Sequence, residues 1–193
     1  MRFIKLYAVV ASVVMFGLLF VGCGNNTKFK KADVVTDFGD ASIEAATLGN
    51  TRNVYKIGDV YFAGQPDKAD LEKIKNVGVN TVINLRMPDE VSWDEKQAVN
   101  ELGMIYYNLP LGSADMMTPE LSETLRGLLN NVDNLPLLLH CGSANRVGAM
   151  WLIYRVIDDG LSYEEALAEA KTVGLRSDAL TNKAKELVEL HQK

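Results

Sequence analysis

The sequence predicts an α/β domain built on a central, mostly parallel β-sheet that is flanked by helices. Short apolar segments rich in Val, Ile and Leu alternate with longer segments whose apolar residues recur at helical spacing. This alternation is typical of a parallel sheet whose strands are joined through helices. The chain has 193 residues, 48% hydrophobic and 23% charged, which suits one globular domain with a short additional segment.

The boundaries of the predicted elements come from turn and capping signals. Gly58-Asp59 joins two β-rich segments, as expected of a hairpin. Thr118 before a proline predicts a helix start, and Ser162 with Glu165 has the spacing of a capping box. The predicted strands cover residues 54–57, 60–63, 79–85, 104–109 and 137–140, and the predicted helices cover 67–76, 94–102, 118–130, 147–157, a segment from 162, and 178–191.

The first residues carry the pattern of an export signal. Arg2 and Lys5 precede an uncharged apolar run at 6–21, which is shorter than the ~20 residues that usually span a membrane. Residues 20–23, Phe-Val-Gly-Cys, resemble the lipobox of bacterial lipoproteins, in which the cysteine is acylated, although Phe20 replaces the usual leucine. The alternative is an uncleaved N-terminal anchor with an incidental cysteine.

This resemblance divides the chain into a signal peptide at 1–22, a lipidated tether at 23–50 and a domain at 51–193. Cys23 is then the lipid attachment site, and the protein is expected to be exported and anchored to the cell envelope. Gly24 after the cysteine suits the outer membrane, or the periplasmic face, of a diderm. The net charge is −5 and no basic block occurs, so nucleic acid is not an expected partner.

One loop carries the chemistry of a catalytic site. It lies between the apolar strand that ends at His140 and the apolar helix that begins near Val147. A short loop entering a helix can turn its backbone N–H groups inward as an anion-binding nest, and the helix start adds about half a positive charge. Arg146 can bind an oxyanion through two parallel hydrogen bonds, and thiols in such surroundings ionise with pKa values of roughly 3.5–7.5. The loop therefore combines a nucleophile, Cys141, with an oxyanion site.

Each of these residues also has a plain structural interpretation. Cys141 alone would be a small buried residue at a strand end, and Arg146 alone an ordinary first-turn residue. Their combination between a strand and a helix favours the functional interpretation. His140 either supports the loop through a hydrogen bond or is a strand-end histidine, and it is not assigned a catalytic role. The predicted phosphate-binding residues are Gly142, Ser143, Ala144, Asn145 and Arg146.

The chain resembles a bacterial phosphatase-like family that is related to dual-specificity tyrosine phosphatases and is often labelled beta-lactamase-hydrolase-like. The resemblance rests on His-Cys-x4-Arg-Val-Gly at 140–148, Ile-Gly-Asp-Val-Tyr-Phe-Ala-Gly-Gln-Pro at 57–66 and Thr-Val-Ile-Asn-Leu-Arg at 81–86, and it extends from about 54 to 175. It implies the fold of the cysteine phosphatases and a phosphate monoester substrate, such as phosphotyrosine in a protein or a small phosphoester, with no cofactor and no metal. In that mechanism Cys141 attacks phosphorus, Arg146 and the loop amides stabilise the transition state, and an aspartate protonates the leaving oxygen.

The sequence departs from this family in three places. Four residues separate Cys141 from Arg146, where the well-known phosphatase signature has five. Four is common in rhodanese-type sulfurtransferases, so a persulfide carrier on Cys141 is the first alternative. Val147 replaces the hydroxyl residue that helps the thiolate leave, which favours slow turnover or a second alternative, a catalytically weak phosphate-binding lipoprotein. Ala144 stands where relatives often have glycine.

The general acid is assigned from loop position. Ligands of a parallel sheet bind at the carboxyl ends of its strands, where we expect loops 86–93, 110–117 and 141–146 to meet. The resemblance places the acid of related phosphatases in the second loop, at Asp115, while Asp89 and Glu90 in the first loop are alternatives. Arg86 contacts a substrate anion or pairs with one of these acids.

Overall fold

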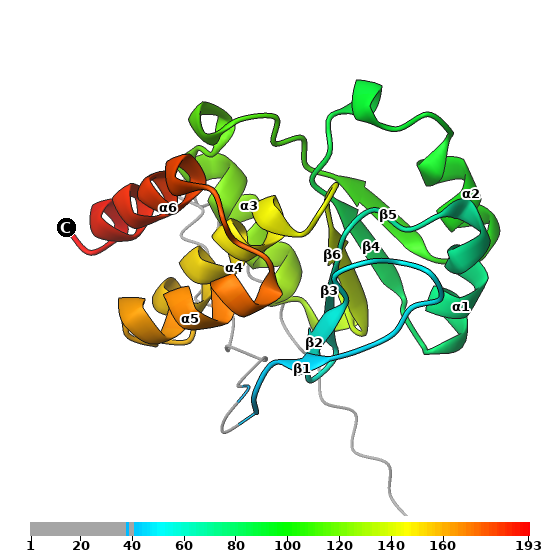
Figure 1. Cartoon of the computed structure of the whole chain (residues 1–193), viewed down its shortest axis with the longest axis horizontal. Helices are drawn as coiled ribbons and strands as arrows, with labels where there is room; N and C mark the ends of the chain where they lie inside the picture. The colour runs from blue at the N-terminus through cyan, green and yellow to red at the C-terminus, as the bar shows by residue number, and fades with distance from the viewer. Residues whose placement is uncertain (1–37, 39–40) are drawn as a thin grey trace, which may run out of the picture. The chain divides into compact units, whose positions relative to one another are not determined.

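The computed structural model describes residue 38 and residues 41–193, and they contain a six-stranded mixed sheet with the order β1-β2-β3-β6-β4-β5 (Figure 1). Strands β3, β6, β4 and β5 are parallel, whereas β1 and β2 are antiparallel additions at one edge. The predicted fold class is therefore confirmed. The strands are β1 Glu44–Ala45, β2 Tyr55–Ile57, β3 Val60–Ala63, β4 Thr81–Asn84, β5 Ile105–Asn108 and β6 Leu137–His140.

The parallel strands end in register. The last residue of β6, His140, pairs with Ala63 of β3 and Asn84 of β4, and Asn84 pairs in turn with Asn108 of β5. The segments that leave these strands consequently start at the same edge of the sheet, as the sequence predicts.

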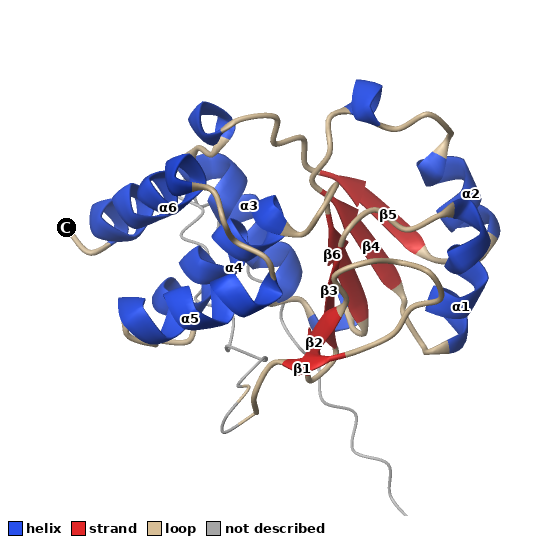
Figure 2. Ribbon diagram, viewed as in Figure 1, coloured by secondary structure: helices blue, strands red, loops and turns tan. Residues whose placement is uncertain are grey.

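The helices cover both faces of the sheet, as Figure 2 shows. α1 and α2 lie on one face, and α3, α4, α5 and α6 lie on the other. The helices are α1 Leu71–Asn76, α2 Glu95–Glu101, α3 Pro119–Leu129, α4 Asn145–Ile157, α5 Tyr163–Val173 and α6 Asp178–His191, and the short 3-10 turns are η1 Lys68–Asp70, η2 Pro88–Glu90, η3 Ala114–Met116 and η4 Val132–Asn134.

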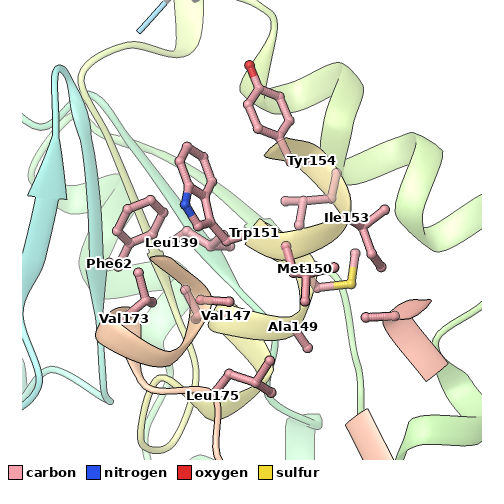
Figure 3. Close-up of a cluster of buried hydrophobic side chains, with 14 of the residues drawn as sticks. Phe62, Leu139, Val147, Ala149, Met150, Trp151, Ile153, Tyr154, Val173 and Leu175 are labelled. Carbon is pink, nitrogen blue, oxygen red and sulfur yellow. The ribbon is translucent and has the colours of Figure 1, made fainter. Parts of the chain in front are cut away.

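The helix α4 follows the candidate loop and is buried along most of its length. Its Trp151 packs against Phe62 of β3, with ring centroids 4.7 Å apart (Figure 3). On another side of α4, Gly148 lies very close to the end of α5. A Cβ atom on Gly148 would lie 2.6 Å from the carbonyl oxygen of Ala170. Because α4 is packed on several sides, its N-terminus is held firmly at the sheet edge.

The local signals agree with the structure at several positions. β2 and β3 form the predicted hairpin. The Thr118 hydroxyl accepts a hydrogen bond from the Leu121 amide at 3.2 Å, and Ser162 and Glu165 form the predicted capping box. The structure thus confirms these three elements, which could be predicted because each depends on residues close together in the sequence.

The beginning of the domain differs from the interpretation of the sequence. Cys23 and residues 1–37 lie outside the described residues, so the structure does not describe the predicted signal peptide or most of the predicted tether. However, β1 pairs with β2 and Leu48 is 1% exposed, so the folded part includes residues that the sequence assigned to the tether. Phe38 also packs on Trp151, with ring centroids 5.4 Å apart. In the part of the chain that the structure describes, no helix is long and apolar enough to cross a membrane.

Candidate active site

The loop that starts at Cys141 is held from the outside by its carbonyl groups. Cys141 is 1% exposed, and its amide donates to the Ala63 carbonyl at 3.3 Å. The Gly142 carbonyl accepts from the Gln65 amide at 3.3 Å. The Ser143 carbonyl accepts from Asn53 Nδ2 at 3.2 Å and from the Arg176 guanidinium at 3.3 Å. The loop carbonyls are thus tied to the surrounding scaffold.

The amide groups of the same loop are available to an anion. Among the described residues, no protein acceptor takes the backbone N–H groups of Gly142, Ser143, Asn145 or Arg146. They lie at the N-terminus of α4, where the helix dipole is positive. The arrangement has the character of an anion-binding nest.

Ala144 makes the turn from the loop into α4. Its φ of 65° and ψ of 1° lie in the left-handed region, which costs a residue with a Cβ about 1 kcal/mol. Alanine therefore adopts here the conformation for which glycine is preferred. The short loop keeps its geometry because Ala144 is fully buried and its carbonyl accepts from the Gly148 amide at 2.9 Å.

Arg146 connects the three loops that the sequence predicts to meet. Its Nη1 donates to the Leu111 carbonyl at 2.9 Å and to the Leu85 carbonyl at 3.3 Å. Its two terminal nitrogens also donate to the two carboxylate oxygens of Glu90, each at 2.8 Å. The Arg146 guanidinium also interacts with the Cys141 side chain, so it lies beside the candidate nucleophile, where it can bind an oxyanion.

Glu90 is an anion in this structure and is a poor candidate for the general acid. Its hydrogen bonds from Arg146 lower the pKa of Glu90 to about 2. The same contact raises the pKa of Arg146 above its already high ordinary value, and the Cys141 thiol acts in the same direction. Arg86 Nε lies 3.4 Å from a Glu90 carboxylate oxygen, so Arg86 pairs with an acid, one of the two roles considered for it.

Asp115 and Asp89 are both exposed. Asp115 lies in η3, in the same loop as Leu111, which places it on the segment that Arg146 contacts. Asp89 lies beside Glu90 in η2. The assignment of Asp115 as the acid stays a prediction.

Sequence reasoning missed a buried polar group beneath the loop. Glu95 of α2 is 3% exposed and accepts from Gln65 Nε2 at 2.7 Å, Asn84 Nδ2 at 2.6 Å and the Tyr106 hydroxyl at 3.3 Å. The fully buried His140 lies against it, with Nε2 3.4 Å from Glu95 Oε1. Gln65 belongs to the Gly-Gln-Pro segment of the family resemblance, which is the only signal that could have pointed to this group.

A second arginine at the loop was also missed. Arg176, in the connection between α5 and α6, is exposed, and its guanidinium donates to the Ser143 hydroxyl at 2.5 Å. Its backbone amide donates to Asn145 Oδ1 at 2.8 Å, which fastens this connection to the loop. Ser143 and Asn145 thus use their side chains as structural contacts, and Val147 is fully buried in the core (Figure 3).

Comparison with known proteins identifies the fold. No family model and no curated protein matches the sequence, but solved structures do. Pseudomonas aeruginosa TpbA with its cysteine replaced by serine, in complex with phosphotyrosine, has a TM-score of 0.57 and 20% identity, covering 73% of this chain and 91% of TpbA. The fold is that of the tyrosine-phosphatase-like proteins.

Two further structures support the same fold. A candidate phosphatase from Shewanella putrefaciens CN-32 has a TM-score of 0.62 and 21% identity, covering 74% of this chain and 95% of its own. Kinase-associated phosphatase with its catalytic-site cysteine changed to serine has a TM-score of 0.63 and 14% identity, covering 69% of this chain and 87% of its own. This chain therefore spans nearly the whole length of each.

Proposed function

We propose that the protein is a cysteine-dependent phosphatase that hydrolyses phosphate monoesters through a phosphocysteine at Cys141. The observation that supports this proposal is the single loop that joins the cysteine, four amides that have no acceptor among the described residues, and the guanidinium of Arg146. These groups match the three non-bridging oxygens of a phosphoryl group, whose charge is stabilised by fixed hydrogen-bond donors. The neighbouring phosphatase structures agree with this chemistry.

The reaction has two steps. The Cys141 thiolate attacks phosphorus and forms the S–P bond while the P–O bond to the leaving group breaks, and Asp115 gives its proton to the leaving oxygen. Water then attacks phosphorus, Asp115 takes a proton from it, and the thiolate and inorganic phosphate leave. Glu90 stays an anion and holds Arg146, because the pKa of Glu90 is lowered to about 2.

Phosphotyrosine is the proposed substrate class, with small phosphoesters as the alternative. The TpbA structure contains phosphotyrosine, and this chain shares its fold. The test is hydrolysis of para-nitrophenyl phosphate and of a phosphotyrosine peptide by the full chain. Cys141→Ser should abolish turnover and keep phosphate binding, whereas Arg146→Lys should restore the charge but not the bidentate geometry and remain well below wild type.

The same preparations test the alternatives. Activity with thiosulfate and cyanide, lost in Cys141→Ser, together with no phosphatase activity, would favour the sulfurtransferase. Phosphate binding without turnover of any substrate would favour the phosphate-binding lipoprotein, for which the absence of a hydroxyl at Val147 is the specific observation.

The acid has a test of its own. Asp115→Asn should slow hydrolysis of an alkyl phosphate by about 10²–10⁴-fold and of para-nitrophenyl phosphate much less, since nitrophenolate leaves without a proton. Equal rates of wild type and Asp115→Asn on the alkyl phosphate would move the assignment to Asp89.

We further propose that the protein is exported and anchored to the cell envelope by a lipid on Cys23. The support is the charged start, the apolar run and the Gly22-Cys23 junction. Mass spectrometry of the envelope fraction should find an acylated N-terminal cysteine, and Cys23→Ser should accumulate unprocessed. An unmodified chain cut at another position would contradict the proposal.

A further inference from the structure

The loop from Cys141 to Arg146 is contacted near both of its ends by residues of other loops. Near its start, the Gly142 carbonyl accepts from the Gln65 backbone amide at 3.3 Å. At its end, Arg146 donates to both carboxylate oxygens of Glu90 at 2.8 Å. Gln65 follows β3, and Glu90 lies in η2, after β4. Because β6 lies between β3 and β4 in the sheet, the two residues approach the loop that follows β6 from its two sides (Figure 1).

Arg86 joins these two residues through its guanidinium. Its Nη1 donates to Gln65 Oε1 at 2.7 Å, its Nε donates to a Glu90 carboxylate oxygen at 3.4 Å, and its Nη2 donates to the Glu90 carbonyl oxygen. Since a guanidinium can only donate, the Gln65 atom that faces it is the amide oxygen. Gln65, Arg86 and Glu90, which we call the brace, therefore connect the contact at Gly142 with the contact at Arg146.

The brace is fixed to the ends of the parallel strands. The Arg86 amide donates to Asn84 Oδ1 at 2.7 Å, and the Arg86 carbonyl accepts from Asn108 Nδ2 at 2.9 Å. Asn84 and Asn108 are the last residues of β4 and β5. The Gln65 Nε2 atom donates to the buried Glu95 side chain at 2.7 Å. The Arg86 side chain is 16% exposed, and its backbone and its partner Gln65 are both held, so its conformation is preorganised.

The charges along the brace alternate, because Glu90 lies between the cations Arg86 and Arg146. Hydrogen bonds from Arg146, supported by those from the Met87 amide and Arg86, lower the pKa of Glu90 to about 2 against the opposing effect of burial. Glu90 is therefore a carboxylate at neutral pH and accepts from both guanidinium groups. A bidentate pair has a fixed geometry, so the orientation of this carboxylate sets the orientation of the Arg146 guanidinium.

We propose that Gln65 and Arg86 are positioning residues for Arg146: Gln65 orients Arg86, and Arg86 orients the Glu90 carboxylate that holds the catalytic guanidinium. Among the described residues, neither has a hydrogen bond to Arg146, so each acts through Glu90. Because the Gln65 amide also holds the Gly142 carbonyl, one residue ties the start of the anion-binding loop to its end. The kinetic part of the proposal rests on the proposed phosphatase function. Direct contact of Arg86 with the substrate anion is the alternative, and it predicts a loss that does not depend on Glu90.

Removing the acceptor at position 65 tests the brace. Methionine has a similar length but cannot accept from Arg86 as an amide oxygen does. Gln65→Met should lower kcat/KM of the full chain for para-nitrophenyl phosphate by about 10–100-fold, since a small displacement of a catalytic group has effects of this size. Arg86→Met should cause a similar loss, and it keeps the test valid if Gln65→Met does not fold. A wild-type kcat/KM in either variant would overturn the proposal.

Two variants control for general effects of the substitutions. Gln97→Met makes the same change at an exposed glutamine of α2. Arg126→Met removes an arginine that pairs with Asp158 at the other end of α4. Both should keep kcat/KM close to the wild-type value, although Arg126→Met loses an ion pair. A loss in Arg126→Met equal to that in Arg86→Met would show that lost stability lowers the rate, and it would overturn the positioning role.

A double-mutant cycle between Gln65 and Glu90 tests whether the brace acts as a unit. Among the described residues the two side chains share no hydrogen bond, and they meet through Arg86. The loss in Gln65→Met/Glu90→Gln should be at least about threefold smaller than the product of the two single losses, as for members of one network. Arg86→Met should likewise cost less in Glu90→Gln than in wild type. Losses that multiply in either cycle would overturn the proposal, and in the second they would indicate that Arg86 contacts the anion directly.

Phosphate binding separates this proposal from the proposed function. In the Cys141→Ser background, Gln65→Met should raise the Kd of inorganic phosphate, measured by calorimetry, by about 3–10-fold, because a displaced Arg146 binds the anion less well. Gln97→Met should leave this Kd unchanged. If wild type hydrolyses no phosphoester, the proposed function fails, while a raised Kd still supports the positioning role. An unchanged Kd in Gln65→Met, or no binding of phosphate to Cys141→Ser, would overturn it.

Discussion

Breaking the Glu90–Arg146 ion pair should destabilise the fold in a pH-dependent way. Glu90→Gln removes the charge that accepts two 2.8 Å hydrogen bonds from the guanidinium. The fall of the Glu90 pKa from 4.5 to about 2 corresponds to about 3 kcal/mol at full value, at about 1.4 kcal/mol for each pKa unit. Because the Glu90 side chain is 33% exposed, screening by solvent reduces the expected loss to about 1–2 kcal/mol.

The sign of the pH dependence follows from the direction of the pKa change. Folding lowers the Glu90 pKa, so the stabilisation is complete above pH 4.5 and is lost as the pH falls through about 2. The difference in unfolding free energy between wild type and Glu90→Gln should therefore shrink to less than half at about pH 3.

Urea unfolding of both proteins at neutral pH and near pH 3 measures this difference. Asp89→Asn, which changes an exposed acid of the same short turn, is the control and should stay within about 0.5 kcal/mol of wild type. If the difference in unfolding free energy between wild type and Glu90→Gln is the same at both pH values, the ion pair does not provide the stabilisation. If Asp89→Asn lowers the unfolding free energy as much as Glu90→Gln does, the effect comes from the conformation of the turn and not from the ion pair.

Three further predictions follow from the packing and charges around the loop. Val147→Thr should lower the free energy of unfolding by about 1–3 kcal/mol, because it buries a hydroxyl group. It should also reduce a pre-steady-state burst of para-nitrophenol, since the hydroxyl assists departure of the thiolate. An unchanged burst would contradict the kinetic part of this prediction. Arg176→Ala should raise the Ki of phosphate about two- to tenfold at low salt and less at high salt, and an effect independent of salt would exclude a charge contribution. Gly148→Ala should lower the free energy of unfolding by about 1–3 kcal/mol, since the new methyl group would lie 2.6 Å from the Ala170 carbonyl oxygen. Gly127→Ala, with open space around it, should be neutral or stabilising. Equal Tm values for the two variants in thermal melts would refute the steric argument.

The fold was predictable because its signals are local. The cap at Thr118, the capping box at Ser162 and the turn at Gly58 each depend on residues within one turn of the chain, and the structure contains all three elements. The loop from Cys141 to Arg146 was identified for the same reason, because a strand, a short loop and a helix follow one another in the sequence.

The missed residues depend on packing between distant segments. Glu95 looked like an ordinary first-turn residue, since its burial results from the way α2 lies against the ends of β4 and β5. The contact of Arg176 with Ser143 joins residues 33 positions apart. The two-residue strand Glu44–Ala45 is too short for a periodic signal, so the edge of the sheet was taken as tether.

The position of Phe38 shows at which end of the sheet the described part of the domain begins. The Phe38 ring lies beside Gly58, in the turn that precedes β3, and therefore at the end of the sheet where the parallel strands begin. Cys141 lies at the opposite end, where β6 stops. Phe38, which is the first described residue, and Cys141 therefore lie at opposite ends of the parallel strands.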